Sequence, residues 1–183
     1  MYLVNTRPKY AGPSWELKSI NSMDIQSMSD NSRVWVYQSN RVLNDAEVQE
    51  INKMAQHFVT GWDAHGALLQ SMIKVYDYLF IVIIVDETVA RVSGCAIDKS
   101  VAFIKKIEQQ LNVQLFDRMQ VAYKRDNMIE TCSMQEFQEL ANSGVINEQT
   151  LVFNNLVNTK KEFESNWIIP LEKSWHKRML SLK

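Results

Sequence analysis

An apolar run near the middle of the chain sets the strongest limit on its fold. Leu79–Val85 contains seven consecutive apolar residues, most of them β-branched, and the acids Asp86 and Glu87 follow directly. A run of this length and composition is typical of a buried strand. The wider stretch Ile73–Val85 includes charged residues and is shorter than the roughly 20 apolar residues of a membrane-spanning helix. We therefore expect a buried strand here, without membrane insertion.

Two fragments of this region look like ATPase motifs in reversed order. Ile81–Glu87 is similar to a Walker B strand, which carries an Asp to a magnesium site at its carboxyl end. Gly94–Ser100 is similar to a Walker A loop, but it lacks the second glycine and is one residue short. Walker A normally precedes Walker B, so we expect no ATP hydrolysis here. Leu79–Ser100 is nevertheless the first place to look for a site.

The composition argues against several classes of protein. The 183 residues include 20 Lys and Arg against 21 Asp and Glu, so no strong overall field attracts nucleic acid. Cys95 and Cys132 are too few for a disulfide scaffold, and no signal-peptide pattern opens the chain. A chain of this length suits one domain. We expect a cytoplasmic protein with a single domain over residues 33–183, and no binding to nucleic acid.

The first 32 residues follow neither a helical nor a strand period. They contain two of the three prolines and a run of Ser, Asn, Asp and Met residues. We expect residues 1–32 to be a disordered leader. Because Met23 and Met28 lie just before the first strand pattern, a second hypothesis is that translation begins at one of them rather than at Met1.

Local patterns predict a strand and then a helix at the start of the domain. The run that follows Arg33 is rich in β-branched and aromatic residues, which favours a strand. Asn44 and, three residues later, Glu47 form the pattern of a helix capping box. Apolar residues recur at helical spacing as far as Trp62, and Gly61 is placed to end the helix in a left-handed conformation.

The next segment predicts a hairpin and a second helix. Residues 71–86 are rich in β-formers but too numerous for one strand, so we divide them near Asp77–Tyr78. After a loop that contains Gly94, an apolar stripe predicts a helix that begins near Asp98.

A second hairpin and a third helix follow. Met119–Tyr123 and Met128–Cys132 are separated by four polar residues, which predicts two paired strands. Ser133 and Glu136 form another capping box, and Gly144 ends that helix. The order β-α-β-β-α-β of the first six elements matches the ferredoxin-like pattern. The expected class is α+β, a mostly antiparallel sheet with an added hairpin and C-terminal helices.

The tail over 158–183 is basic and contains tryptophan. Thr159–Glu162 is a capping-box pattern that opens a short helix, and Pro170 suits the first turn of a last helix. The tail carries six Lys and Arg against three Glu. Such a segment could bind an acidic partner or RNA, or Trp167 and Trp175 could dock it on the core. We favour docking.

Five stretches of the chain together resemble a known family. They are RVWVYQSNR (33–41), DE-x6-GCAIDKSVAFI (86–104), FDRMQVAY (116–123), VFNNLVNTKKEFE (152–164) and PLEKSWHKR (170–178). They are similar to a family of small bacterial proteins that are often named ABC transporter ATPase, over roughly residues 33–180. That name implies ATP hydrolysis. A transporter ATPase domain, however, is longer than this chain and needs an intact P-loop, an LSGGQ-type signature and a downstream Walker B, which this sequence lacks. The resemblance implies kinship and assigns no catalytic residue.

One candidate for chemistry is a thiol. Cys95 follows Gly94 near the start of the second predicted helix, where backbone N–H groups and the helix dipole can lower a thiol pKa. His65 could act as its base if the fold brings the two together. The alternative is a small half-buried Cys in a tight turn and a loop histidine.

A second candidate is a divalent metal site. Asp86, Glu87, Asp98 and Asp117 could supply the oxygen ligands that Mg²⁺ or Mn²⁺ needs, since three of them lie at the ends of predicted elements. Each also has a structural alternative: solvation at a strand end, a helix cap or an ion pair.

A third candidate is an anion site at the turn before the second helix. A helix N-terminus that is preceded by glycine and followed by a lysine favours phosphate or carboxylate, and a nucleotide with Mg²⁺ is one such ligand. The residues are Ser93, Gly94, Cys95, Asp98, Lys99 and Ser100. The sequence therefore predicts a ligand-binding or partner-binding domain. The alternative is a small enzyme that uses Cys95 or a metal held by Asp86, Asp98 and Asp117.

Overall fold

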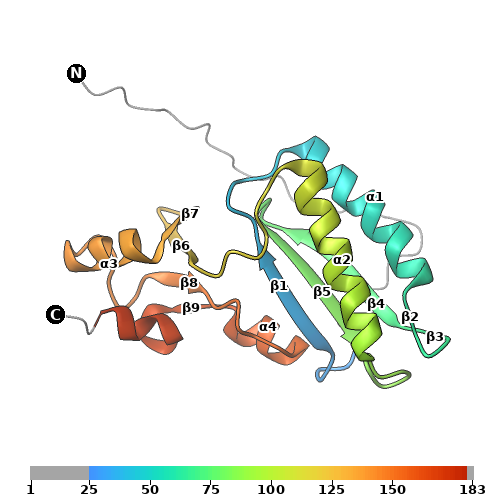
Figure 1. Ribbon diagram of the computed structural model, residues 1–183. Coiled ribbons are helices and arrows are strands. Elements are labelled where there is room, and N and C mark those ends of the chain that lie inside the picture. The colour runs from blue at the N-terminus through green and yellow to red at the C-terminus, as the bar shows by residue number, and fades with distance from the viewer. Residues whose placement is uncertain (1–24, 181–183) are drawn as a thin grey trace.

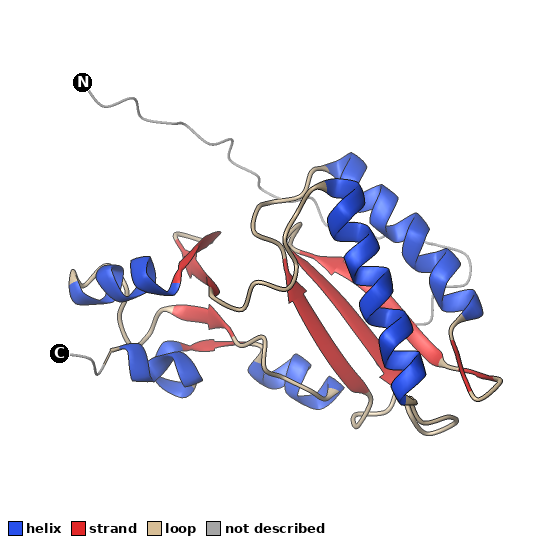
Figure 2. Cartoon of the chain, viewed as in Figure 1, coloured by secondary structure: helices blue, strands red, loops and turns tan. Residues whose placement is uncertain are grey.

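The computed structural model describes residues 25–180 of the chain. Figures 1 and 2 show a sheet with two long helices on one face, and beside it a smaller sheet with shorter helices. The first half contains η1 (Ile25–Ser27), β1 (Arg33–Gln38), α1 (Asp45–Gly61), β2 (Asp63–Ala64), β3 (Ala67–Leu68), β4 (Gln70–Tyr76), β5 (Phe80–Asp86) and α2 (Gly94–Leu111). The second half contains β6 (Gln120–Arg125), β7 (Met128–Ser133), α3 (Met134–Asn142), β8 (Leu151–Phe153), α4 (Lys160–Asn166), β9 (Ile168–Pro170), η2 (Leu171–Lys173) and η3 (Trp175–Met179).

The predicted buried strand is β5, and it is the central strand of its sheet. Every residue of β5 is buried, and the strand lies between β1 and β4 with antiparallel pairing on both sides. Ile83 is opposite Trp35 on one side and Ile73 on the other. An apolar run can be covered in this way only when layers of structure pack on both faces of the sheet.

The two faces of β5 belong to different parts of the core. Ile81, Ile83 and Val85 pack against residues of α1 and α2. The alternate residues Phe80, Val82 and Ile84 pack against the second half of the chain, where Phe80 stacks on Phe153 with ring centroids 4.6 Å apart. Burial of each large apolar side chain contributes about 1.5–3 kcal/mol. The same strand therefore holds both sheets together.

The α+β class with antiparallel sheets is confirmed, but the ferredoxin-like order is not. β1 and β4 flank β5, as in a split β-α-β unit, and within the described residues these three strands make up the first sheet. The next strand, β6, joins a second sheet in the order β7-β6-β8-β9 instead of pairing with β1. The chain just before α4 pairs with the free edge of β1 instead. The Val34 N–H donates to the Asn158 carbonyl at 3.0 Å, and Arg33 forms a β-bridge with Thr159.

The local predictions are largely confirmed. Asn44 and Ser133 each open a helix with a complete capping box, in α1 and α3. Asp77 and Tyr78 both have positive φ, 51° and 56°, in the turn between β4 and β5. The hydroxyl of Thr159 accepts from the N–H three residues on and so caps α4. These patterns act over a few residues, which is why the sequence reveals them.

Other local predictions were wrong in position or type. α2 begins at Gly94, about one turn before Asp98, because the side chain of Ser93 caps it by accepting from the Ala96 N–H at 3.2 Å. Gly61 remains helical, and the chain then enters the unpredicted β2–β3 hairpin. The helix expected from Pro170 is two short 3₁₀ turns, η2 and η3.

The prediction of a disordered leader was also wrong for its last residues. Residues 25–32 are described, and Met28 is buried with 4 % of its surface exposed. Lys160, also buried, pairs with Asp30 at 3.3 Å and ties this segment to α4. The prediction for residues 1–24, including the possible starts at Met1 and Met23, lies outside the described residues.

The tail docks on the core as favoured. Trp167 is buried and stacks on Phe163 with centroids 4.6 Å apart. Trp175 stacks on the buried His176 at 3.8 Å, and Arg178 lies over the indole ring. The aromatic side chains are therefore used for packing. Among residues 25–180, no helix has the length and apolarity that crossing a membrane requires.

Candidate functional site

The residues predicted to hold an anion lie in the first two turns of α2. The Ser93 hydroxyl caps the helix, and the buried Ser100 donates its own hydroxyl to the Ile97 carbonyl at 2.7 Å. Lys99 Nζ lies 2.6 Å from Asp63 Oδ1. These groups already have partners within the protein, which weakens the case for an anion at the helix start.

The fold places Cys95 and His65 in neighbouring segments of the chain, since the β2 strand before His65 contacts α2. His65 and Gly66 form the turn between β2 and β3, with φ of 53° and 82°. That hairpin is tied to the start of α2, because the Trp62 indole N–H donates to the Ala96 carbonyl at 2.9 Å. Cys95 is exposed. Neither Cys95 nor His65 lines the grooves described below.

The four acids proposed as metal ligands have separate roles. Asp86 accepts from the Ser29 and Thr88 N–H groups, and Glu87 accepts from the Val92 N–H at 2.9 Å. Asp117 accepts from the Met119 N–H at 2.8 Å, and Asp98 is exposed on α2. In residues 25–180, no three His, Cys, Asp or Glu side chains form a group that could hold a metal ion.

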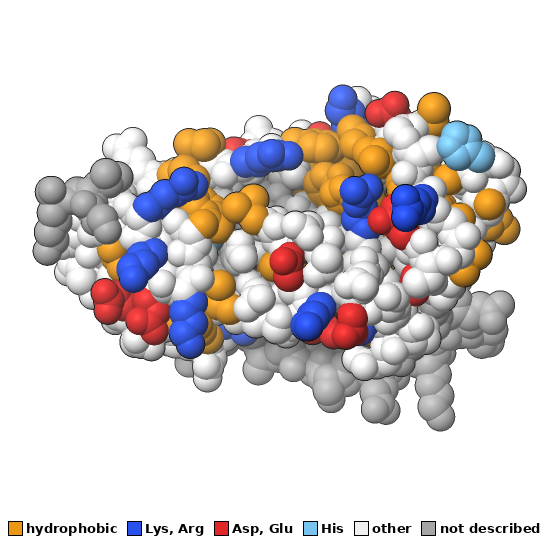
Figure 3. All heavy atoms as spheres, turned by 90° about the horizontal axis from the view of Figure 1, so that it is seen from below, with side chains coloured by type: hydrophobic (Ala, Val, Ile, Leu, Met, Phe, Trp, Pro, Cys, Tyr) orange, Lys and Arg blue, Asp and Glu red, His pale blue; other side chains and the backbone are white. Residues whose placement is uncertain are grey.

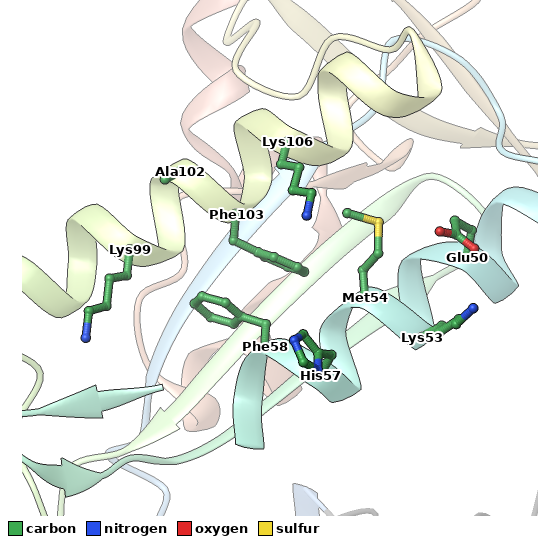
Figure 4. Close-up of a pocket in the computed structure, with 9 residues that line it drawn as sticks. All are labelled: Glu50, Lys53, Met54, His57, Phe58, Lys99, Ala102, Phe103 and Lys106. Carbon is green, nitrogen blue, oxygen red and sulfur yellow. The ribbon is translucent and has the colours of Figure 1, made fainter. Parts of the chain in front are cut away.

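A groove of about 540 Å³ lies between α1 and α2, on the side away from the sheet (Figure 4). It is open to solvent and largely apolar. The lining residues are Glu50, Lys53, Met54, His57 and Phe58 of α1, and Lys99, Ala102, Phe103 and Lys106 of α2. Of the residues predicted from the sequence to hold a ligand, it contains only Lys99.

The floor of the groove is aromatic. Phe58 and Phe103 stack with ring centroids 4.5 Å apart and planes 18° apart, and Met54 lies beside them. Phe103 is only 7 % exposed, whereas Met54 and Phe58 are half-buried. The two helices pack on the same face of the sheet, so their facing side chains meet to form this floor.

The rim of the groove carries excess positive charge. Among the described residues, no acidic side chain forms an ion pair with Lys53 or Lys106, while Lys99 pairs with Asp63. Glu50 is the one carboxylate of the lining, and it accepts from the Gln110 amide at 2.9 Å. In Figure 4 the Lys106 side chain extends from α2 over the groove toward α1. Two unpaired cations therefore lie next to apolar surface.

Sequence reasoning missed this groove for a physical reason. The sequence predicts an apolar stripe on each of the two helices, and Met54 and Phe58 lie at the helical spacing of the first stripe. A groove, however, depends on which side chains of two helices face each other, and 48 residues lie between His57 and Lys106 in the sequence. The side chains of α1 and α2 face each other only because both helices pack on the same face of the sheet.

In a second, acidic groove the polar side chains pair with one another. The Tyr123 hydroxyl donates to Glu130 at 2.7 Å, and Arg125 pairs with the same carboxylate at 2.7 Å. Cys132 lies there too; burial first, and then the charges of Glu136 and Glu130, raise the pKa of its thiol to about 11. The thiol stays protonated near neutral pH, so it is a poor nucleophile.

Figure 3 shows the distribution of charged and apolar side chains on one face of the molecule. Basic and acidic side chains are interspersed there, with apolar side chains between them. Mixed charges of this kind produce a weak net field, in keeping with the near-neutral composition.

Comparisons with known proteins give no further guide to function. No family model matches this chain, and neither the curated proteins nor the solved structures contain a significant match.

Proposed function

We propose that this protein is a binding module whose site is the groove between α1 and α2. Its ligand carries negative charge together with an apolar part. This proposal keeps the anion preference that the sequence suggests, and Lys99, but moves the site from the start of α2 to the groove. Kinship with the bacterial family and a cytoplasmic location remain our predictions, the latter based on the free cysteines Cys95 and Cys132.

One observation carries the proposal: Lys53 and Lys106 have no acidic partner among the described residues and flank the Met54, Phe58 and Phe103 floor. A ligand that covers the floor removes apolar surface from water. Its anionic groups can pair with the lysines at the rim, where the adjacent apolar surface lowers the effective dielectric. Neither contribution requires the protein to rearrange.

The enzyme alternative has less support. Cys95, His65 and Asp86 line neither of the two grooves described above. Asp86 uses its carboxylate oxygens as hydrogen-bond acceptors for two backbone N–H groups. A nucleophile without a positioned base, or a lone carboxylate, gives little rate enhancement. We therefore do not propose a catalytic step or a bound metal.

The test uses 8-anilinonaphthalene-1-sulfonate, an anionic aromatic probe, and a matched pair of charge reversals. Lys106→Glu changes the rim, whereas Lys105→Glu makes the same charge change at the next residue of α2, outside the groove. We expect Lys106→Glu to weaken binding about five- to tenfold, because a reversed charge at a partly desolvated site costs on the order of 1 kcal/mol. Lys105→Glu should change it less than about twofold.

Fluorescence titration measures the affinity, and NMR shift mapping places the probe. Perturbed signals should include Met54 and Phe103. Equal effects of the two charge reversals, or shifts confined to other surfaces, would overturn the proposal. Inorganic phosphate is the second arm: shifts at Gly94 and Cys95 with phosphate, and none in the groove with the aromatic probe, would return the site to the start of α2.

A further inference from the structure

The groove lining repeats at helical spacing on both walls. On α1 the lining residues 50, 53, 54, 57 and 58 follow steps of three, one, three and one. On α2 the lining residues 99, 102, 103 and 106 follow the same rule. Residues at these spacings form one continuous ridge on a helix surface. Two parallel ridges with a furrow between them are the surface that a third helix packs against.

The length of the furrow also fits a helix. At 1.5 Å of rise per residue, Lys99 and Lys106 are about 10 Å apart along α2, and Glu50 and Phe58 about 12 Å apart along α1. The furrow therefore spans roughly two helical turns. A helix docked in it would present apolar residues three or four positions apart to the floor, and carboxylates on its flanks to the lysines.

We propose that the ligand of this groove is an acidic amphipathic helix of a partner protein. The inference rests on the proposed function and specifies its ligand class. The apolar ridge of that helix covers Met54, Phe58 and Phe103. Carboxylates on its two flanks pair with Lys53 of one wall and Lys106 of the other, so the positive rim selects an acidic helix over a basic one.

Charge and exposure argue against an occupant from this chain. Residues 1–24 contain three basic and two acidic side chains, so that segment offers no excess of negative charge. A second copy of the described part would need an α-helix with exposed apolar residues. The exposed large apolar residues of residues 25–180 all lie outside α-helices: Val42, Leu68, Val89, Phe116, Met119, Met128, Val145, Leu151 and Leu156.

The shape of the groove also disfavours a small molecule as the natural ligand. Pockets for small molecules usually enclose about 70–90 % of the ligand surface. This groove is open to solvent. A helix needs only one covered face, which an open furrow provides.

The experiment uses a designed peptide of about 15 residues, long enough to form helix on a surface. Leucines lie on one face and glutamates on both flanks. One control peptide has the same composition in an order that destroys the apolar face, and another has lysine in place of glutamate. Fluorescence anisotropy measures affinity, and circular dichroism measures helix formation in the complex. The full chain is used throughout.

We expect the acidic amphipathic peptide to bind and to gain helicity, with about tenfold weaker binding to Lys106→Glu and an affinity for Lys105→Glu within about twofold of wild type. The double variant Lys53→Glu/Lys106→Glu should prefer the lysine peptide. Such an exchange of preference is not expected from a variant that merely fails to fold.

Each contrary result has its own meaning. If the reordered peptide binds as tightly as the amphipathic one, the helix inference fails while the anionic groove stands. If neither the acidic amphipathic peptide nor the reordered peptide binds, and Lys106→Glu still weakens binding of the aromatic probe, the partner class is wrong. If Lys106→Glu also leaves the affinity of the aromatic probe unchanged, the proposed function itself fails. Self-association of the protein that Lys106→Glu abolishes would identify a second copy as the occupant and overturn the inference.

Discussion

The backbone N–H of Ser29 donates a 2.8 Å hydrogen bond to Asp86, which lies 57 residues later in the chain. The other carboxylate oxygen of Asp86 accepts from the Thr88 N–H at 3.0 Å. The acid that ends the Walker-B-like strand therefore fixes the segment before β1 and the turn after β5. With 4 % of its surface exposed, Asp86 has a structural role in this molecule.

Replacing Asp86 should destabilise the protein. Asp86→Asn keeps the shape but removes the charge from a buried acceptor of two N–H groups, so we expect a loss of about 2 kcal/mol in the free energy of unfolding. Urea denaturation measures the loss, and hydrogen exchange should show faster exchange at Ser29. Asp98→Asn, at an exposed position of α2, is the control and should change stability by less than about 0.5 kcal/mol.

The same carboxylate predicts a response to acid. Burial raises the pKa of Asp86, but the hydrogen bonds from Ser29 and Thr88 outweigh burial, so the pKa lies below its ordinary value. Because the pKa of Asp86 is lower in the folded state, its charge stabilises the fold fully at any pH above the pKa of the unfolded state, which is near 3.8. This stabilisation is lost as the pH falls through the pKa of the folded state. Wild type should lose this contribution below about pH 4, and Asp86→Asn should lack that part of the profile.

Trp62→Phe should weaken the link between the β2–β3 hairpin and α2. Trp62 is fully buried, and its indole N–H donates to the Ala96 carbonyl. Phenylalanine leaves that carbonyl without this donor and leaves a gap, which together cost about 2–3 kcal/mol. Thermal unfolding checks the value. A loss below about 0.5 kcal/mol would show that the bond is not formed in solution.

His176 predicts a second pH dependence, at higher pH. Burial first, and then the nearby Arg178 charge, lower the pKa of His176 from 6.5 to about 4, and its Nδ1 shares a 2.7 Å hydrogen bond with the Ser174 hydroxyl. The neutral ring is favoured in the folded state, so this stability is fully present above pH 6.5 and is lost as pH falls through 4.

The expected loss between pH 7 and pH 4 is roughly 3 kcal/mol. Chemical denaturation at a series of pH values gives the profile. His176→Phe should flatten it between these limits, whatever the variant does to stability at neutral pH. A profile with the same slope in wild type and variant would mean that His176 is accessible to protons in the folded state.

The two cysteines should react at different rates. Cys95 is exposed, whereas burial and nearby glutamates raise the pKa of Cys132 to about 11. Iodoacetamide near neutral pH should therefore label Cys95 first, with Cys132 labelled only slowly, because the thiolate is the reactive form. Mass spectrometry of peptides measures both rates. Faster labelling of Cys132 would contradict the buried position, and Cys132→Ser should leave the Cys95 rate unchanged.

The sequence by itself determined the features that depend on neighbouring residues. Asn44 and Ser133 start helices because each side chain reaches an N–H three residues away, and the β4–β5 turn lies at Asp77 and Tyr78, as predicted. The buried strand β5 was evident from the seven consecutive apolar residues of Leu79–Val85, most of them β-branched.

Tertiary structure alone decided how these pieces combine. β6 joins β7 and β8 instead of β1, because the chain around Asn158 and Thr159 already pairs with the β1 edge. The groove likewise exists only because α1 and α2 pack on one face of the sheet and bring Lys53 and Lys106 to the same furrow. Sequence periodicity reports which face of a helix is apolar, but long-range packing decides which faces meet.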